Sequence, residues 1–199
     1  ETYRYWASGN STGVAEKHYD GGWILCGMNE FGVSYGCNTI FTKEKRIERG
    51  EGILRYSIRA CRGKRHITDP AAVELIGDLI DKFGQSDSAV AFCVADPYEA
   101  WVVEASYRRW VAKRIPDDEI HIEANQLTIE TEWDLASKDL VDFAKEQGWY
   151  DPVDGPFNFK YAYCPEDRLD QPSDTGREYQ AYYMLEDKIG AITVQDILS

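Results

Sequence analysis

The feature that most constrains the fold of this chain is a turn between two strand-like segments near its beginning. Residues 23–25 (WIL) are apolar, residues 29–32 (NEFG) have the composition of a turn, and residues 33–38 (VSYGCN) follow. Gly32 can adopt the positive φ that such a turn needs. The next six residues have the two-residue period of a β-strand. The pattern predicts a β-hairpin, with Val33, Tyr35 and Cys37 on one side of its second strand and Ser34, Gly36 and Asn38 on the other.

The carboxamide of Asn38 stands at the end of this second strand. A carboxamide in such a place suits an oxyanion hole, because it donates a hydrogen bond without adding a charge. Most asparagines in sheets are instead ordinary polar residues whose hydrogen bonds are satisfied. The hairpin alone leaves both interpretations of Asn38 open.

Helical and strand-like segments alternate along the rest of the chain. The clearest helix is expected over residues 69–83, where Pro70 suits the first turn and Gly84 suits the end. Further helices are expected over residues 52–61, 137–147 and 173–188, and strands over residues 89–95, 100–105 and 109–115. Antiparallel strands with helices before and between them predict an α+β layered fold. The length suits a single domain, residues 1–199.

Both ends of the chain have the pattern of interior points of a longer sequence. The chain begins at Glu1 without a methionine, and residues 193–199 resemble a helix that is just beginning. Thr193 is its expected N-cap, and Val194, Ile197 and Leu198 begin an expected buried stripe. We therefore expect an internal fragment, a partial domain that is incomplete at both ends.

Composition argues against several classes of partner and site. The formal net charge of −13 disfavours binding to a nucleic-acid backbone. No apolar run reaches the roughly 18 residues of a membrane span. The five cysteines contain no CxxC pair, and the three histidines have no metal-ligand spacing, so no metal and no cofactor are predicted. The acidic charge and the odd number of cysteines favour a cytoplasmic protein, and the oligomeric state stays open.

Three polar residues stand where apolar or structured runs end: Asn38, Asn125 and Arg177. Two amides and a guanidinium together could bind a carbonyl oxygen, an amide and a carboxylate. Taken separately, Asn125 suits a turn and Arg177 suits the surface of a helix. No nucleophile accompanies the three, so these residues by themselves leave an enzyme and a non-enzyme equally open.

Several motifs occur in a characteristic order. They are residues 27–33 (GMNEFGV), 95–104 (ADPYEAWVVE), 110–118 (WVAKRIPDD), 125–129 (NQLTI), 147–150 (QGWY) and 157–159 (FNF). With them the chain resembles the secernin and dipeptidase family of cysteine N-terminal-nucleophile (Ntn) hydrolases. The last two motifs resemble the secernin branch in particular. The resemblance covers roughly residue 21 to the C-terminus.

This resemblance implies an αββα sandwich and a hydrolase that cleaves an amide bond in dipeptides or small N-acyl compounds. In that family an N-terminal cysteine attacks the amide carbonyl, its own α-amine acts as the general base, and an acyl-enzyme forms and is hydrolysed. By the same resemblance Asn38 would donate into the oxyanion hole, and Asn125 would hold the substrate across the cleft or share that role. Arg177 would lie near the nucleophile and lower the pKa of its thiol.

The chain departs from the family pattern at its beginning, because the catalytic cysteine would lie upstream of Glu1. None of its cysteines stands at the chain start, so none can use its own α-amine as a base; they are Cys26, Cys37, Cys61, Cys93 and Cys164. We expect these 199 residues to be inactive alone, and the longer parent protein to be a cysteine dipeptidase or amidohydrolase.

Two other functions stay open. One is a catalytically inactive secernin-like protein that acts by binding a partner, and the other is acyl transfer to an amine instead of to water. Asp96 and Glu104 could be argued as an acid–base pair, but by the family resemblance their positions suggest a structural turn and a strand end. Tyr179, Tyr182 and Tyr183 have helical spacing and are expected to pack in a core rather than to hold a substrate.

Overall fold

The computed structural model describes residues 5–10, 23–29, 32–48, 50–54, 69–86 and 88–198. The expected hairpin is present, because β2 (Trp23–Asn29) and β3 (Ser34–Thr39) pair antiparallel. Gly32 lies between them with a φ of +86°, and a Cβ atom there would be 3.2 Å from Pro97. The positive φ and the close proline ring both favour glycine, so the turn chemistry read from the sequence is confirmed.

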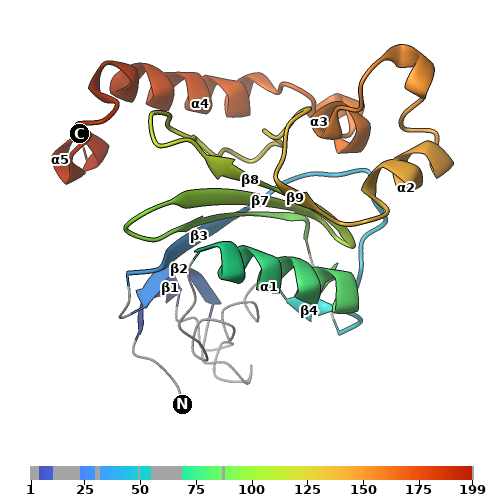
Figure 1. Cartoon of the computed structure of the whole chain (residues 1–199), viewed down its shortest axis with the longest axis horizontal. Coiled ribbons are helices and arrows are strands. Elements are labelled where there is room, and N and C mark those ends of the chain that lie inside the picture. Colours follow the sequence, from blue (N-terminus) through green and yellow to red (C-terminus); the bar gives the residue numbers. More distant parts are fainter. Residues whose placement is uncertain are drawn as a thin grey trace.

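A seven-stranded antiparallel sheet forms the centre of the molecule (Figure 1). Its order is β1-β2-β3-β6-β7-β8-β9. The other strands of this sheet are β1 (Tyr5–Asn10), β6 (Val90–Ala95), β7 (Ala100–Ser106), β8 (Arg109–Ile115) and β9 (Leu135–Ala136). The three strands expected over residues 89–115 are therefore confirmed within one or two residues at their ends.

A separate two-stranded parallel ladder joins β4 (Ile53–Leu54) to β5 (Gln85–Ser86). The Ile53 N–H donates to the backbone oxygen of Gly84 over 2.8 Å. The helix expected over residues 52–61 is thus wrong at Ile53 and Leu54, because pairing with a distant strand overrides the weak helical pattern. Residues 55–61 of that expected helix lie outside the described part of the chain.

Helix α1 (Asp69–Phe83) covers one face of the sheet (Figure 1). Val73, Ile76 and Ile80 are buried against apolar side chains of β6, β7 and β8. Gly77 faces Trp110 so closely that a Cβ atom there would lie 2.1 Å from the indole ring. The helix expected over residues 69–83 is confirmed, and the residue that follows it, Gly84, has a φ of +73°.

The opposite face of the sheet is covered by the segment of residues 116–134 and by helices that follow it (Figure 1). These helices are α2 (Leu140–Glu146), α3 (Phe159–Tyr163) and α4 (Pro172–Leu185), with short 3₁₀ turns η3 (Pro152–Asp154), η4 (Glu166–Arg168) and η5 (Glu186–Lys188). Leu140, Phe159 and Tyr163 pack there against Val111 and Leu127. The last helix, α5 (Val194–Leu198), lies beside the sheet. Helices on an antiparallel sheet make this an α+β fold, as predicted.

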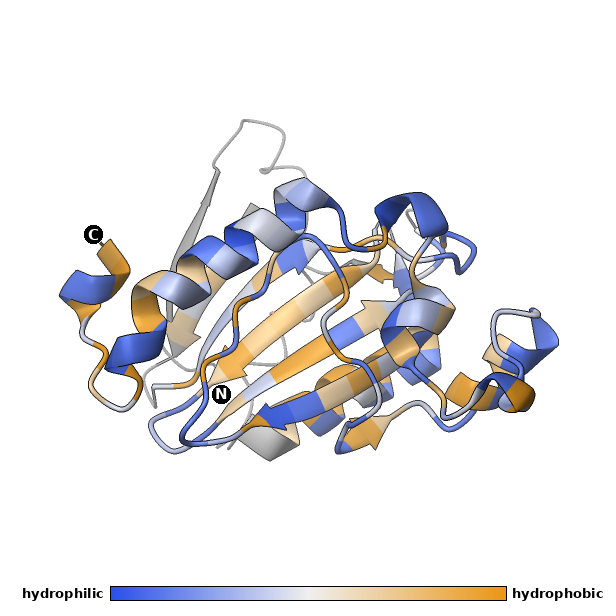
Figure 2. Ribbon diagram, turned by 90° about the horizontal axis from the view of Figure 1, so that it is seen from above, coloured by the Kyte–Doolittle hydropathy of each residue, from blue (hydrophilic) through white to orange (hydrophobic). Residues whose placement is uncertain are grey.

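Helix α4 is polar around most of its surface (Figure 2). Tyr179 and Tyr183 are 73% and 78% exposed, and Tyr182 is 43% exposed. The expectation that these tyrosines pack in a core is wrong in this structure. Two charged side chains of α4 join this helix to the segment of residues 116–134. Arg177 donates to Asn125, and Glu178 accepts from Gln126.

Helix α5 begins where the sequence predicts. The Thr193 hydroxyl accepts from the Asp196 N–H over 3.4 Å, while the Thr193 N–H donates to the Asp196 carboxylate over 2.9 Å, which is a capping box. Its apolar side chains Val194, Ile197 and Leu198 are exposed. The buried stripe expected for them is therefore wrong here, because none of the described elements packs on this face.

Candidate functional site

The end of β3 and the segment around residue 125 hold each other through two reciprocal amide contacts. Asn38 Nδ2 donates to the backbone oxygen of Ala124, and Asn125 Nδ2 donates to the backbone oxygen of Thr39 across 2.8 Å. A carboxamide has two N–H donors, so one donor on each side chain is occupied by this junction. The fold thus brings together two asparagines that the sequence singles out separately.

Arg177, the third candidate residue, reaches the same place from α4. Its Nη2 donates to Oδ1 of Asn125 across 2.9 Å and also to the carboxylate of Asp174, whose side chain is buried. Its Nε donates to the backbone oxygen of Ser173 over 3.1 Å. The guanidinium is therefore paired with a carboxylate of its own helix, and its contact outside that helix orients the amide of Asn125.

Glu104 lies beneath this junction on β7. It is in the same row across the sheet as Asn38, since Asn38 is opposite Ala91 and Ala91 is opposite Glu104. Its buried carboxyl accepts hydrogen bonds from the N–H and the hydroxyl of Thr128, both over 2.6 Å. Burial raises the pKa of Glu104 to about 8, and the charge of Glu123 adds to this. These contacts tether the segment that follows Asn125 to the sheet.

Asp96, which the sequence pairs with Glu104 as an alternative, lies elsewhere. Its Oδ1 accepts from the backbone N–H groups of Tyr98 and Glu99, over 2.7 and 3.0 Å. This is the hydrogen bonding of an Asx turn between β6 and β7. The geometry therefore gives Asp96 a turn-forming role.

Glu123, Glu178 and His121 lie close to Glu104 and Thr128, and these five residues form a cluster of polar side chains. Glu123 has a side chain only 6% exposed and lies 3.0 Å from Nε2 of His121. Burial raises the pKa of Glu123 well above its usual value, the charge of Glu178 adds to this, and a hydrogen bond from Asn38 opposes it. Burial also lowers the pKa of His121 and raises that of Glu178, whose Oε2 accepts from Gln126 over 2.5 Å.

The sequence analysis did not single out Glu123, Glu178 and His121. A weak signal was present, because Glu178 directly follows Arg177 and Glu123 stands two residues before Asn125. Neither spacing marks a carboxyl that will be buried. Their grouping arises only from the approach of α4 to the segment before residue 126.

Two of the described cysteines, Cys93 and Cys164, do not offer a reactive thiolate. Cys93 lies on β6, and burial raises the pKa of its thiol to about 12, with the charges of Glu123 and Glu104 adding to this. The thiol therefore stays protonated and weakly nucleophilic at neutral pH. Burial likewise raises the pKa of Cys164. Cys61 lies outside the described residues.

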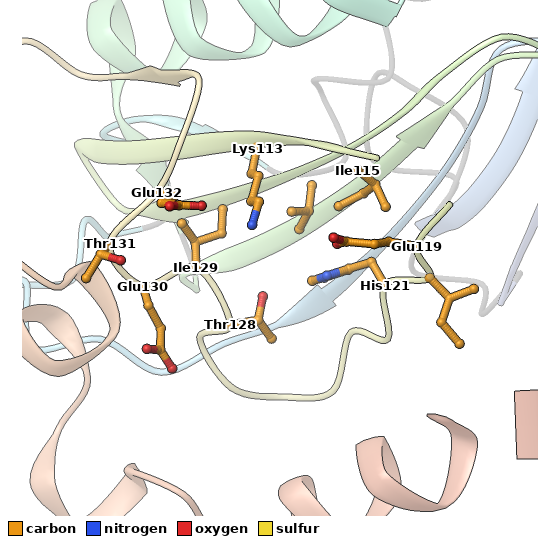
Figure 3. A pocket seen from close by; sticks show the side chains of 11 residues that line it. Lys113, Ile115, Glu119, His121, Thr128, Ile129, Glu130, Thr131 and Glu132 are labelled. Atoms are coloured by element: carbon orange, nitrogen blue, oxygen red, sulfur yellow. The ribbon is translucent and has the colours of Figure 1, made fainter. Parts of the chain in front are cut away.

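A pocket of about 270 Å³ opens beside the cluster (Figure 3). His121 and Thr128 belong both to its wall and to the cluster. The remaining lining residues are Val102, Lys113, Ile115, Glu119, Ile120, Ile129, Glu130, Thr131 and Glu132. On the other side of His121 and Thr128, a shallower hollow of about 290 Å³ lies against Tyr179 and Tyr182 of α4. The pocket's mixture of charges and apolar side chains suits a small polar ligand.

Neither a metal-binding cluster nor a membrane-spanning helix occurs among the described residues. No group of three or more His, Cys, Asp or Glu side chains there is arranged to hold a metal ion. Within the same part of the chain, no helix has the length and apolar character needed to cross a bilayer.

Comparison with known proteins gives consistent matches. The model of peptidase family C69 matches residues 50–196. A probable dipeptidase of Salmonella dublin is 38% identical over an alignment of 106 positions, gaps included, that covers 49% of this chain and 24% of that protein. A dipeptidase of Bifidobacterium longum (strain NCC 2705) is 26% identical over an alignment of 200 positions, gaps included, that covers 83% of this chain and 36% of that protein. The chain thus spans between a quarter and two fifths of the length of these relatives.

Proposed function

Because this chain belongs to peptidase family C69, we propose that it is part of a dipeptidase, which hydrolyses the amide bond of dipeptides or of small N-acyl compounds. The observation that carries the proposal is the junction of Asn38, Asn125 and Arg177. The names of the two relatives, a probable dipeptidase and a dipeptidase, support the same class of substrate.

In this proposal the nucleophile is a cysteine that precedes residue 1 and becomes the N-terminus of the mature protein. Its α-amine takes the thiol proton, and the sulfur attacks the amide carbonyl carbon. The carbon–nitrogen bond then breaks, the leaving nitrogen takes the proton, and the resulting thioester is hydrolysed by water. The secernin branch is the part of the family to which we assign the chain.

Asn38 and Asn125 would supply the hydrogen bonds of this reaction. One N–H of each amide donates to the backbone of the other segment, which holds the plane of the amide, and the side chain of Asn38 also donates to Glu123. In the reaction this N–H of Asn38 would donate to the oxyanion instead of to Glu123 as the carbonyl becomes tetrahedral. Asn125, oriented by Arg177, would hold the substrate or share that donation.

We further propose that a second sheet, as an αββα sandwich requires, covers the part of the Asn38-bearing face over β3 and β6 that residues 116–134 and the helices after them leave open. Ser34, Gly36 and Cys93 on this face are only partly buried. A Cβ atom on Gly36 would meet no atom within 4 Å. Space above a sheet that is closely packed on its other face supports a further layer there.

The test is the mature N-terminus of the longer parent protein, measured by intact mass and terminal sequencing and followed by turnover of a panel of dipeptides. We expect a terminal cysteine and release of free amino acids, while the 199-residue chain alone is expected to be inactive. A terminus other than cysteine, together with no hydrolysis, would contradict the proposal and favour the inactive partner-binding alternative.

A further inference from the structure

Glu123 lies against the side chain that is proposed to bind the oxyanion. Asn38 Nδ2 donates to the backbone oxygen of Ala124, and the Asn38 side chain also donates to the Glu123 carboxyl. Both N–H groups of this amide are thus used within the protein itself. An oxyanion can receive a hydrogen bond from Asn38 only if one of these contacts is given up. The contact to Ala124 holds two segments of the chain together, so the contact to Glu123 is the one available for exchange.

The surroundings of Glu123 favour a neutral carboxyl group. Its side chain is almost fully buried, and its Oε1 has no hydrogen-bond partner among the described residues. Its Oε2 lies 3.0 Å from Nε2 of His121 and 3.5 Å from the Thr128 hydroxyl. Because water does not reach the unpartnered oxygen, a negative charge on this carboxyl is costly, and the protonated form is preferred.

Four ionisable groups face Glu123, and none of them is a cation at neutral pH. They are Glu104 on β7, Cys93 on β6, Glu178 on α4 and His121 in the same segment. Burial raises the pKa of the two other glutamates, raises that of the Cys93 thiol to about 12, and lowers that of His121. The three carboxylates would repel one another, so each carboxyl loses its proton less readily in the presence of the others.

Two lysines lie close to the neighbours of Glu123. Burial lowers the pKa of His121 and Lys113 on β8 adds to this, while Lys160 on α3 opposes the rise that burial causes in the pKa of Glu178. The Lys160 ammonium is paired with Asp170 over 2.7 Å. Within the described part of the chain, neither lysine forms an ion pair with Glu123. Its carboxylate would therefore have no cation to neutralise it.

The protonation state of Glu123 controls how readily Asn38 can give up the exchangeable N–H. A carboxylate accepts a hydrogen bond roughly twice as strongly as a neutral carboxyl does. When Glu123 is neutral, a developing oxyanion is the stronger acceptor and wins the N–H. When Glu123 is ionised, it retains the N–H and also places a negative charge beside the oxyanion, which destabilises the transition state.

We propose that Glu123 is a positioning residue for the oxyanion donor: its neutral carboxyl holds the Asn38 amide in place and yields the N–H to the oxyanion, whereas its carboxylate retains that N–H. This role rests on the proposed function, because it acts through the same oxyanion donor. It makes turnover depend on a buried acid that does not itself contact the reacting atoms.

The pH profile of kcat in the parent enzyme tests this role. We expect log kcat to fall with unit slope on the alkaline side as Glu123 ionises, towards the roughly 100-fold loss that follows removal of one oxyanion donor. Glu123→Gln has no proton to lose, so this alkaline limb should be absent from its profile. Glu74→Gln, at an exposed position on α1, is the matched control and should keep the limb. The same limb in Glu123→Gln and in the unchanged enzyme overturns the proposal.

Glu104→Gln separates the two buried acids in the same experiment. This variant should keep the alkaline limb, because Glu123 is still present to ionise. A limb that is lost in Glu104→Gln and kept in Glu123→Gln would assign it to Glu104 and overturn the proposal.

The hydrogen bond itself can be followed by NMR in the parent protein without turnover. With isotope-labelled asparagine, the two side-chain N–H signals of Asn38 are identified by their absence from Asn38→Ala. The proton donated to Glu123 should move downfield as this carboxyl ionises, since a carboxylate is the stronger acceptor. The movement should be absent from Glu123→Gln.

The spectrum of the unchanged protein is informative without any variant of Glu123. An Asn38 signal that does not move with pH there, or one that moves equally in Glu123→Gln, overturns the proposal. Since these spectra need no nucleophile, failure of the coupling between Asn38 and Glu123 is distinguishable from absence of a terminal cysteine or of hydrolysis in the parent protein.

Discussion

Thr128 donates both its backbone N–H and its hydroxyl to the same carboxylate oxygen of Glu104, each over 2.6 Å. The Ile129 N–H also approaches this carboxyl, over 3.3 Å. The carboxyl has no exposed surface, so a buried acid ties the segment that carries Asn125 to the central strand β7. The protonation of Glu104 is consequently linked to the stability of the candidate site.

We expect the free energy of unfolding to fall as the pH rises from about 6.5 to about 8. Burial raises the pKa of Glu104 from 4.5 to about 8, so in this interval the folded state holds a proton that the unfolded state has already released. The raised pKa values of Glu123 and Glu178 act in the same direction. His121, whose pKa is lowered, acts in the opposite direction only below its ordinary pKa of 6.5. Urea unfolding at several pH values measures the slope.

The same pH series on Glu104→Gln isolates the contribution of this carboxyl. A glutamine keeps an oxygen that can accept from Thr128 but has no proton to lose, so the slope above pH 6.5 should become shallower. Glu186→Gln, at an exposed position in η5, is the control and should keep the original slope. An identical slope in Glu104→Gln and the unchanged chain would contradict the linkage.

Two glycine substitutions in helices should have opposite effects on stability. Gly77→Ala places a Cβ atom 2.1 Å from the Trp110 ring, and such overpacking typically lowers the free energy of unfolding by about 1–3 kcal/mol. Gly176→Ala in α4 meets no atom within 4 Å. It should raise the same quantity by about 0.5–1 kcal/mol through helix propensity and a less flexible unfolded chain. Urea unfolding of both variants checks the pair, and destabilisation by both would refute the packing argument.

Asn38→Ala in the parent enzyme tests the proposed oxyanion donor. Loss of one such donor typically lowers kcat by about 100- to 1,000-fold. Ser34→Ala is the matched control, because Ser34 lies on the same face of β3 and its hydroxyl donates to the Ala95 backbone oxygen over 3.1 Å. We expect kcat of this control to stay close to that of the unchanged enzyme. Near-normal turnover by Asn38→Ala would remove Asn38 from the proposed mechanism.

Arg177→Ala should lower kcat/KM of the parent enzyme by about 10-fold, which corresponds to one hydrogen bond to a charged group. The physical reason is that Asn125 loses the donor that orients its Oδ1. The pH dependence of kcat/KM should be the same in this variant as in the unchanged enzyme, because the charge of Arg177 is already paired with Asp174. A shift of the acid limb to higher pH would show instead that Arg177 lowers the pKa of the nucleophile.

Local signals in the sequence predicted five strands of the central sheet (β2, β3, β6, β7 and β8) and the two longest described helices, α1 and α4. The hairpin of β2 and β3 follows from Gly32 and the alternation after it, and α1 follows from Pro70 in its first turn and Gly84 after its end. These features depend on neighbours within one or two turns of chain, so a short window contains the information. The α+β class follows from the order of such elements.

The predictions were wrong where the structure of a segment depends on contacts with distant parts of the chain, or on the lack of such contacts. Residues 53 and 54 have a weak helical pattern, but they pair with β5 and so form a strand. The tyrosines of α4 and the apolar residues of α5 have core-like spacing, yet they are exposed. Apolar spacing states which side chains could be buried together, and it does not state whether an element is present to bury them.

For the candidate site, the sequence by itself determined the residue types: two carboxamides and a guanidinium, each at the end of a structured run. Only the tertiary structure decided that Asn38 and Asn125 bind each other's segments, because each donor is 86 residues from its acceptor. It also decided that Glu104, Glu123 and Glu178 are withdrawn from water beside them, which raises their pKa values. Desolvation depends on everything that packs around a group, and no local pattern contains that information.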